Sequence, residues 1–147
     1  PPIRHFNAMK FLNDVTGIKG LMARSFVVEG TTTHGGVWHN STAYPGWTWK
    51  GDTSSDEVSG HMFAYPLVAT LLKNATVVAQ AKALMSNIAH YITDNGFTLV
   101  DITGRPTTWG HWDPAHINGN RSWSDERGVN ANQIMAFLSA GVNANQI

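Results

Sequence analysis

The densest group of ionisable side chains lies between residues 50 and 63, where three carboxylates and a histidine fall within ten residues. Ser54 and Glu57 have the spacing of a capping box, so a helix is expected to begin there. In that helix Glu57 and His61 lie one turn apart and share a face. The sequence therefore predicts an ionisable cluster at the positive end of a helix, which suits a ligand site.

A second acidic pair, Asp125 and Glu126, follows a tryptophan late in the chain. Glycoside hydrolysis uses two carboxylates, separated by about 5 Å in retaining enzymes and about 6.5–9.5 Å in inverting ones. Two acids on separate segments, flanked by tryptophan, fit this requirement. The candidate catalytic residues are therefore Asp52, Asp56, Glu57 and Glu126.

The same carboxylates also have a structural interpretation. Glu57 can act only as the capping-box acid, and Asp56 can compensate the helix dipole from the first turn. Glu126 can pair with Arg127 or Arg24. Asp52 precedes the cap and has no evident local role beyond a turn with Ser54, made by its side chain.

Six tryptophans are a second unusual feature of so short a chain, and none falls on a predicted helix face. Aromatic rings in loops favour a surface on which sugar rings stack, whereas the alternative is that they pack beneath the loops. With the nearby polar side chains they give the candidate substrate-binding residues Trp38, Trp49, His61, Trp109, His111, Trp112 and Arg127.

The histidines raise the alternative of a metal site. Four of the seven histidines, His34, His39, His61 and His111, could join the carboxylates in a site. None of them has the close spacing of a zinc motif, apart from the single helical turn between Glu57 and His61, and without cysteine thiolate sites are excluded. We expect no metal and no cofactor.

Composition narrows the classes of function. The chain has 147 residues and a formal net charge of zero, which disfavours nucleic-acid binding. No apolar run approaches the roughly 18 residues of a membrane span. Three glycosylation sequons, at Asn40, Asn74 and Asn120, point to an extracellular or secreted protein, although Asn74 is also a predicted helix cap.

The pattern of apolar residues predicts a mainly helical chain. Helices are expected over 3–15, from Ser54 onward with a kink or break at Pro66, from Asn74 to Asn95, and near the C-terminus with a core face of Val129 or Ala131, Ile134 and Leu138. The second and third should form an antiparallel hairpin, because the link between them is very short.

Little β-structure is expected. Residues 24–28 form a strand-like run, 97–109 resemble a hairpin, and Asp113 with Pro114 should begin a short helical turn. Residues 30–50 show no period and contain three tryptophans, so we interpret them as a long ordered loop that lines a cleft. The tail 141–147 repeats 128–134 letter for letter, and its origin stays open.

Five stretches together resemble a poorly characterised family of six-hairpin, glycosidase-like proteins with an (α/α) toroid fold. They are residues 12–26, 49–61, 94–101, 106–112 and 123–130. The resemblance covers about residues 10–140 and implies helical hairpins around a cleft that has acids and aromatics at one end. It carries over no catalytic residue.

A complete toroid of that kind has twelve helices, which need at least roughly 200 residues. We therefore expect residues 1–147 to be a single domain and an incomplete toroid, either a piece of a longer chain or a unit that associates with copies of itself. The predicted function is a glycosidase-like or lyase-like cleft acting on a glycan or polysaccharide. The alternative is a non-catalytic extracellular structural or carbohydrate-binding module that self-associates.

Overall fold

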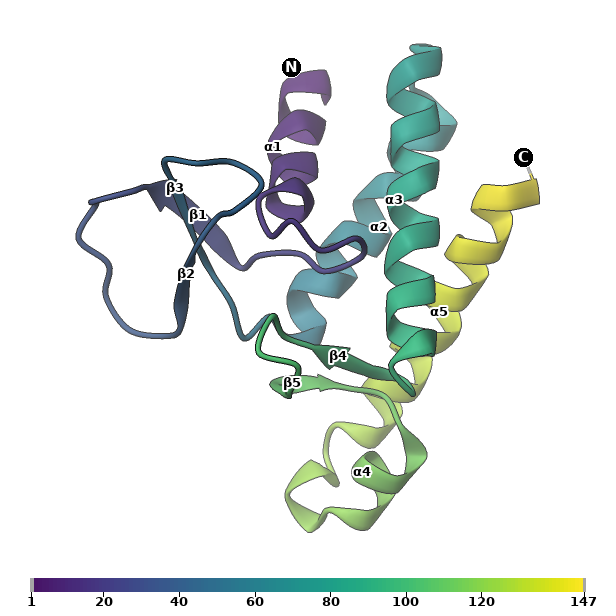
Figure 1. The fold of residues 1–147 in the computed structure, drawn as a ribbon. Helices are drawn as coiled ribbons and strands as arrows, with labels where there is room; N and C mark the ends of the chain where they lie inside the picture. Colours follow the sequence, from purple (N-terminus) through teal and green to yellow (C-terminus); the bar gives the residue numbers. More distant parts are fainter. Residues whose placement is uncertain (1, 147) are drawn as a thin grey trace.

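The structure is a computed structural model that describes residues 2–146, with side chains described as far as residue 144. Its elements, in chain order, are α1 (Pro2–Asp14), β1 (Ser25–Val28), β2 (Trp38–Asn40), β3 (Trp47–Lys50), α2 (Ser55–Leu71), α3 (Ala75–Asp94), β4 (Thr98–Val100), β5 (Pro106–His111), α4 (Pro114–Gly119), a 3₁₀ turn (Arg121–Trp123) and α5 (Arg127–Gln146). Figure 1 shows the long helices on one side and a small sheet on the other.

The expectation of an incomplete (α/α) toroid is wrong. Within the described chain, five helices combine with two small antiparallel sheets in a mixed domain, and 54 % of the chain is helical. A toroid needs helical hairpins in succession, but here a three-stranded sheet with its connections lies between α1 and α2 (Figure 1). The strand-like run 24–28 is confirmed as β1, whereas β2 and β3 escaped prediction because they are only three and four residues long, too short for a visible period.

The first sheet has the order β1-β3-β2, and its central strand comes from the segment expected to be a loop. Trp49 on β3 pairs with Phe26 on one side and His39 on the other. Phe11 of α1 holds the sheet in place, because its ring contacts Phe26 at 4.8 Å and Trp47 at 5.2 Å between centroids. Residues 30–50 thus contain two short strands, β2 and β3, and connecting segments make up the rest.

Helices α2 and α3 form the predicted hairpin (Figure 1), and together they supply eight of the eighteen buried residues of the core. Asn74 caps α3, since its side chain accepts a hydrogen bond from the Val77 N–H at 3.1 Å. Pro66 lies inside α2 and does not end it. The buried residues of these helices recur at helical spacing: Val58, Met62, Tyr65, Val77, Ala81, Met85, Ile88 and Ile92.

The predicted β-hairpin and the short helix after Asp113 are confirmed as β4–β5 and α4. The core face of α5 differs from the prediction, because Val129 is exposed and Ile134 only half-buried, whereas Asn130 and Phe137 are buried. The Asn130 amide donates to the His111 carbonyl at 2.7 Å. This contact binds α5 to the end of β5 and sets which face turns inward.

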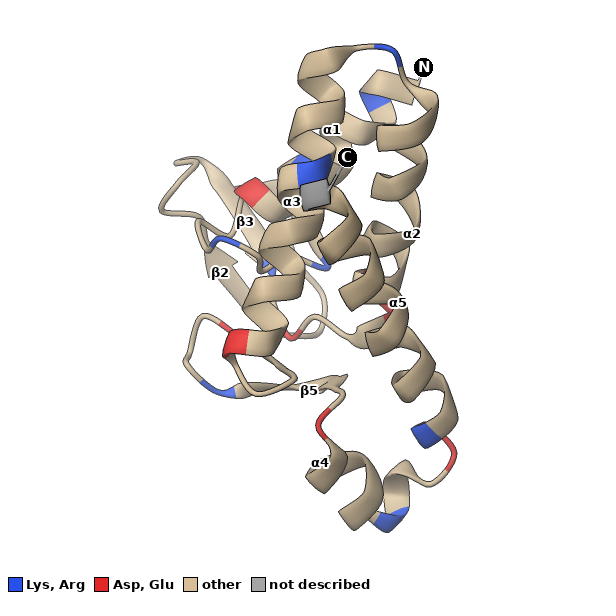
Figure 2. Ribbon diagram, turned by 90° about the vertical axis from the view of Figure 1, so that its right-hand side faces the viewer, with Lys and Arg blue, Asp and Glu red and all other residues tan. Residues whose placement is uncertain are grey.

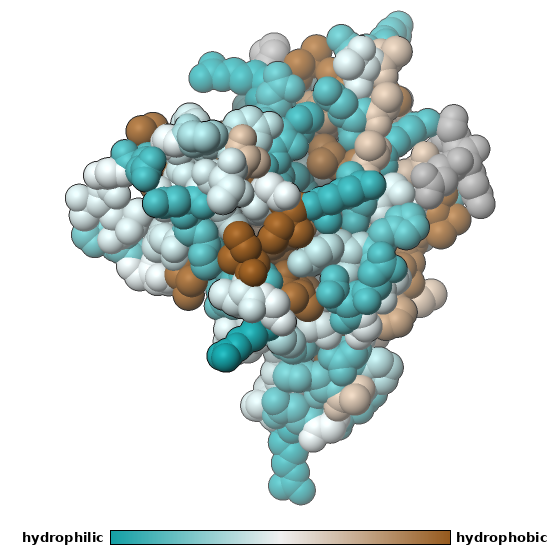
Figure 3. Space-filling model, in the orientation of Figure 1, coloured by the Kyte–Doolittle hydropathy of each residue, from teal (hydrophilic) through white to brown (hydrophobic). Residues whose placement is uncertain are grey.

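The surface is mostly polar but weakly charged. Lysines, arginines and acids are few and dispersed over the elements, as Figure 2 shows. The face seen in Figure 3 carries small apolar patches separated by polar residues. Among the described residues, no helix is both long enough and apolar enough to cross a membrane.

Candidate functional site

A pocket of about 270 Å³ opens where the start of α2 meets β5 and the segment before α5. Its lining combines acids, hydroxyls, one guanidinium and two indoles: Arg24, Ser54, Ser55, Asp56, Trp109, Trp123 and Glu126. Two of the four candidate catalytic carboxylates, Asp56 and Glu126, therefore reach the same cavity from distant parts of the chain. Candidate substrate-binding Trp109 lies there as well.

Asp56 and Glu126 are the least constrained of the four acids. Both are exposed. Asp56 is the second residue of α2 and Glu126 directly precedes α5. Within the described part of the chain neither carboxylate makes a hydrogen bond or an ion pair, so both remain available to a ligand.

The two indoles of the pocket differ in exposure. Trp109 is 52 % exposed, whereas Trp123 is 6 % exposed. Their ring centroids lie 5.8 Å apart and their planes are tilted by 32°. Trp123 thus forms a fixed wall, and Trp109 presents a ring that a flat apolar face of a ligand can cover.

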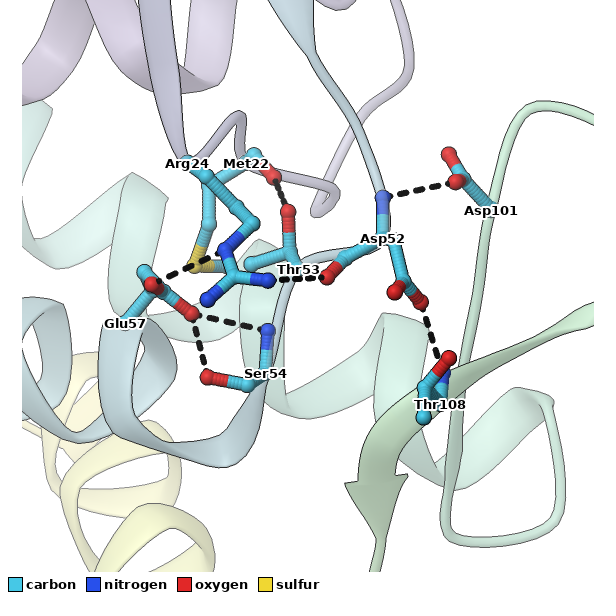
Figure 4. A network of polar contacts seen from close by, with 8 residues as sticks. All are labelled: Met22, Arg24, Asp52, Thr53, Ser54, Glu57, Asp101 and Thr108. Carbon is cyan, nitrogen blue, oxygen red and sulfur yellow. Dashed lines mark hydrogen bonds and ion pairs between the residues drawn. The ribbon is translucent and has the colours of Figure 1, made fainter. Parts of the chain in front are cut away.

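Glu57 serves the helix start, as Figure 4 shows. Its Oε2 accepts the backbone N–H of Ser54 at 2.8 Å and also the Ser54 hydroxyl, and its Oε1 accepts Arg24 Nε at 3.2 Å. Burial alone would raise the pKa of Glu57, but the Ser54 hydrogen bonds and the Arg24 charge outweigh it and leave the pKa below its usual value. The capping box is confirmed, and this carboxylate is fully engaged in it.

Asp52 joins the two sheets (Figure 4). Its Oδ1 accepts the Thr108 N–H at 2.7 Å, and its own N–H donates to Asp101 Oδ2 at 2.8 Å. Its φ of 52° lies in the left-handed region, which aspartate tolerates better than most residues. These contacts place β5, and with it Trp109, beside the start of α2.

His61 points into the core rather than the pocket. It is 4 % exposed, and its Nδ1 lies 2.8 Å from the Tyr65 hydroxyl. Burial lowers its pKa to about 4, and the nearby Glu57 charge opposes that shift only in part. His61 is therefore neutral at pH 7 and belongs to a buried polar cluster.

Three of the other proposed stacking tryptophans lie away from the pocket lining. Trp49 is completely buried beneath the sheet. Trp112 is also buried, with its indole N–H donating to Gln133 at 3.0 Å. Trp38 is half-buried on β2, where its N–H donates to the Gly35 carbonyl at 2.9 Å.

The remaining two candidates support the pocket from behind. His111 is buried and its ring packs against the edge of Trp123, 5.4 Å between centroids. Burial and the neighbouring His116 lower its pKa. Arg127 donates to the carbonyls of Ile117 at 2.8 Å and Asn118 at 3.2 Å, so it fixes the loop after α4.

Sequence reasoning did not place Arg24, Ser55 and Trp123 together at a site. Arg24 follows buried Ala23 and precedes β1. Its Nη1 donates to the Asp52 carbonyl at 3.3 Å while its Nε binds Glu57. No local pattern signals that pairing, because it spans more than thirty residues and depends on how the sheet meets α2.

The three sequon asparagines are all exposed. Asn40 lies at the end of β2, Asn74 caps α3, and the side-chain Oδ1 of Asn120 accepts the Ser122 N–H at 3.1 Å. Their amides are on the surface, where a glycan can be attached.

Comparison of the chain with models of protein families, with curated proteins and with solved structures found no match. The geometry of the pocket is therefore the basis on which function is argued.

Proposed function

We propose that this protein is carbohydrate-active, and that the pocket beside the start of α2 binds a sugar ring for a glycosidase-like or lyase-like reaction. The observation that carries the proposal is the convergence of Asp56, Glu126 and Trp109 on one cavity. Its volume of about 270 Å³ is close to the lower end of the roughly 300–1,000 Å³ typical of ligand pockets, which suits a small ligand.

Four of the lining residues have proposed roles. Asp56 and Glu126 are the acid and the base or nucleophile, because glycosidic bond cleavage needs two carboxylates that are not tied up elsewhere. Trp109 stacks on the sugar, since its ring is half exposed. Arg24 is held by Glu57 and the Asp52 carbonyl, so its guanidinium is a fixed donor for hydroxyl groups.

The test is binding and turnover on a panel of defined oligosaccharides, followed by tryptophan fluorescence and product analysis. Asp56→Asn and Glu126→Gln should each lower turnover by at least about 100-fold, since each removes one partner in proton transfer. Asp125→Asn is the matched control, because Asp125 is exposed and adjacent to Glu126 but does not line the pocket.

Stacking gives a separate readout. Trp109→Ala should weaken oligosaccharide binding about tenfold, which corresponds to about 1.4 kcal/mol. The proposal fails if no glycan on the panel binds, or if the Asp125 control loses as much turnover as the Glu126 variant.

The second candidate is a non-catalytic module that self-associates. It is favoured by an apolar stripe on α2, where Phe63, Leu67 and Leu71 follow one another at intervals of four and are 71, 44 and 70 % exposed. Sedimentation at several concentrations tests it: Phe63→Glu should shift any oligomer to monomer. Glycan binding without turnover in the wild type would favour this candidate over the enzyme.

Secretion is proposed with either candidate, on the exposure of the three sequons. Treatment of natively isolated protein with a glycan-removing amidase should reduce its mass. An unchanged mass would remove this support.

A further inference from the structure

We propose that His111, Asp113 and His116 form a binding site for a divalent transition metal ion, Zn²⁺ being the best match. His111 ends β5, Asp113 caps α4, and His116 lies in the first turn of α4. One ligand atom from each residue lies within 4.8 Å of the other two. The pocket behind Trp109 does not include these residues, so the site is separate from the proposed sugar site.

Two ring nitrogens at this place are buried without a hydrogen bond. They are His111 Nδ1 and His116 Nε2. His111 is only 8 % exposed, and its Nδ1 lies 3.6 Å from Asp113 Oδ2, which is too long for a hydrogen bond. Buried polar atoms are nearly always satisfied, and a metal ion bound beside Asp113 would satisfy both nitrogens at once.

The donor set selects the metal. Two imidazoles and one carboxylate suit Zn²⁺, whereas Mg²⁺ and Ca²⁺ prefer oxygen ligands throughout. With metal–ligand bonds of about 2.0–2.1 Å, tetrahedral ligand atoms lie about 3.4 Å apart, close to the His111–Asp113 separation. Three protein ligands leave the fourth position to water.

The imidazoles must tilt to bind. The rings of His111 and His116 are stacked, 3.8 Å between centroids and 6° between planes, and an imidazole lone pair lies in the plane of its ring. His116 is half-buried on a helix of six residues, so its ring can rotate more easily than the buried ring of His111. Trp123 contacts both rings, at 5.4 and 4.7 Å, and reports that movement.

Binding would link β5 to α4 through side chains rather than through backbone hydrogen bonds alone. It would also fix the wall that Trp123 forms in the pocket. The inference departs from the sequence-based expectation of no metal, whose candidate ligands included His111 but neither Asp113 nor His116.

The experiment uses the full chain without an affinity tag, because a polyhistidine tag binds the same ions. Co²⁺ is added as a spectroscopic probe, then displaced by Zn²⁺. One equivalent should produce visible d–d absorption and quench tryptophan fluorescence. At about 100 times its Kd, Zn²⁺ should raise Tm by roughly 5–10 °C.

Two variants and one control assign the ligands. His116→Gln should weaken Co²⁺ binding at least about 100-fold, and His5→Gln, an exposed histidine on α1, should leave it unchanged. Asp113→Asn is the stricter test, because asparagine caps a helix as well as aspartate does but lacks the anionic ligand. It should weaken binding at least about tenfold while circular dichroism stays unchanged.

The proposal is overturned if Co²⁺ gives no visible bands at one equivalent. It is also overturned if the His5 control loses as much affinity as the His116 variant, or if Asp113→Asn binds as the wild type does. None of these results requires a glycan, so they are independent of the test of the sugar pocket.

Discussion

Two stretches of this chain, residues 38–57 and 109–126, each contain three tryptophans together with histidine and carboxylates. In the first, the side chains are mostly used to build the fold: Trp49 is buried, Asp52 joins the two sheets, and Glu57 caps α2. In the second, Trp109 and Glu126 face a pocket and two histidine nitrogens lack partners.

The difference shows that residue type alone does not distinguish a structural side chain from a functional one, because the contacts and surroundings of each side chain also matter. A carboxylate that accepts two or three hydrogen bonds cannot turn to a ligand without breaking them, which lowers the stability of the fold. Unsatisfied groups occur in the first stretch too: Asp56 makes no contact of its own among the described residues, and His39 Nε2 and Trp49 Nε1 are buried without a hydrogen bond. The two proposals rest on unsatisfied groups that lie together, in a pocket or in a cluster of possible ligands.

The largest expected effect is a difference in stability between variants of two tryptophans, Trp49 and Trp109. Trp49→Ala should lower the free energy of unfolding by about 3–5 kcal/mol, because it removes a fully buried ring from between β1 and β2. Trp109→Ala should change it by about 0.5 kcal/mol or less, because that ring is half exposed. Urea unfolding followed by circular dichroism measures both, and equal losses would remove the contrast.

The next effect is a dependence of stability on pH. The pKa of His61 is about 4 in the folded protein against 6.5 unperturbed, so between these values the unfolded chain binds more protons. Stability should therefore fall by about 3 kcal/mol as the pH drops from 7 to 4. The contacts that matter are Tyr65 and Asn13, with Glu57 as the nearby charge.

His61→Gln provides the control for this prediction. Glutamine does not titrate, so the slope of stability against pH between 6.5 and 4 should flatten whatever the absolute stability of the variant. An unchanged slope would assign the pH dependence to other groups, such as His111, whose pKa is also lowered.

The smallest expected effect is a difference in stability between variants of two neighbouring acids, Glu57 and Asp56. Glu57→Gln should lower the free energy of unfolding by about 0.5–2 kcal/mol, because it weakens the cap and the contact with Arg24. Asp56→Asn should stay within about 0.5 kcal/mol, because that side chain is exposed and makes no contact. If Asp56→Asn proves the more destabilising of the two, Asp56 is a structural residue and not a free acid.

Local signals predicted the helix starts well. Ser54 with Glu57, Asn74, and Asp113 with Pro114 each mark a cap that the structure contains. These succeed because a cap is decided within four residues. The strands within 30–50 were not predicted, because each is only three or four residues long and is defined by its pairing rather than by a local pattern.

The candidate site was predicted only in part. Asp56, Trp109 and Glu126 were identified by type and do share a pocket, whereas Arg24 and Trp123 were not grouped with them. The contact of Arg24 with Glu57 and that of Asp52 with Thr108 decide how the pocket closes. Both join residues far apart in the chain, so no window of sequence contains them.

The duplicated heptapeptide separates what sequence and tertiary structure each decide. Composition and propensity make both copies helical, and both belong to α5 as far as residue 146, with Ile147 outside the described residues. Yet Asn130 is buried and Asn143 exposed, while Gly128 is exposed and Gly141 packs against Ala89. A shift of 13 residues turns a helix by about 220°, so identical letters must face different surroundings. The sequence determined that these residues form a helix. Only the packing of α5 on α3 and β5 decided what each one touches.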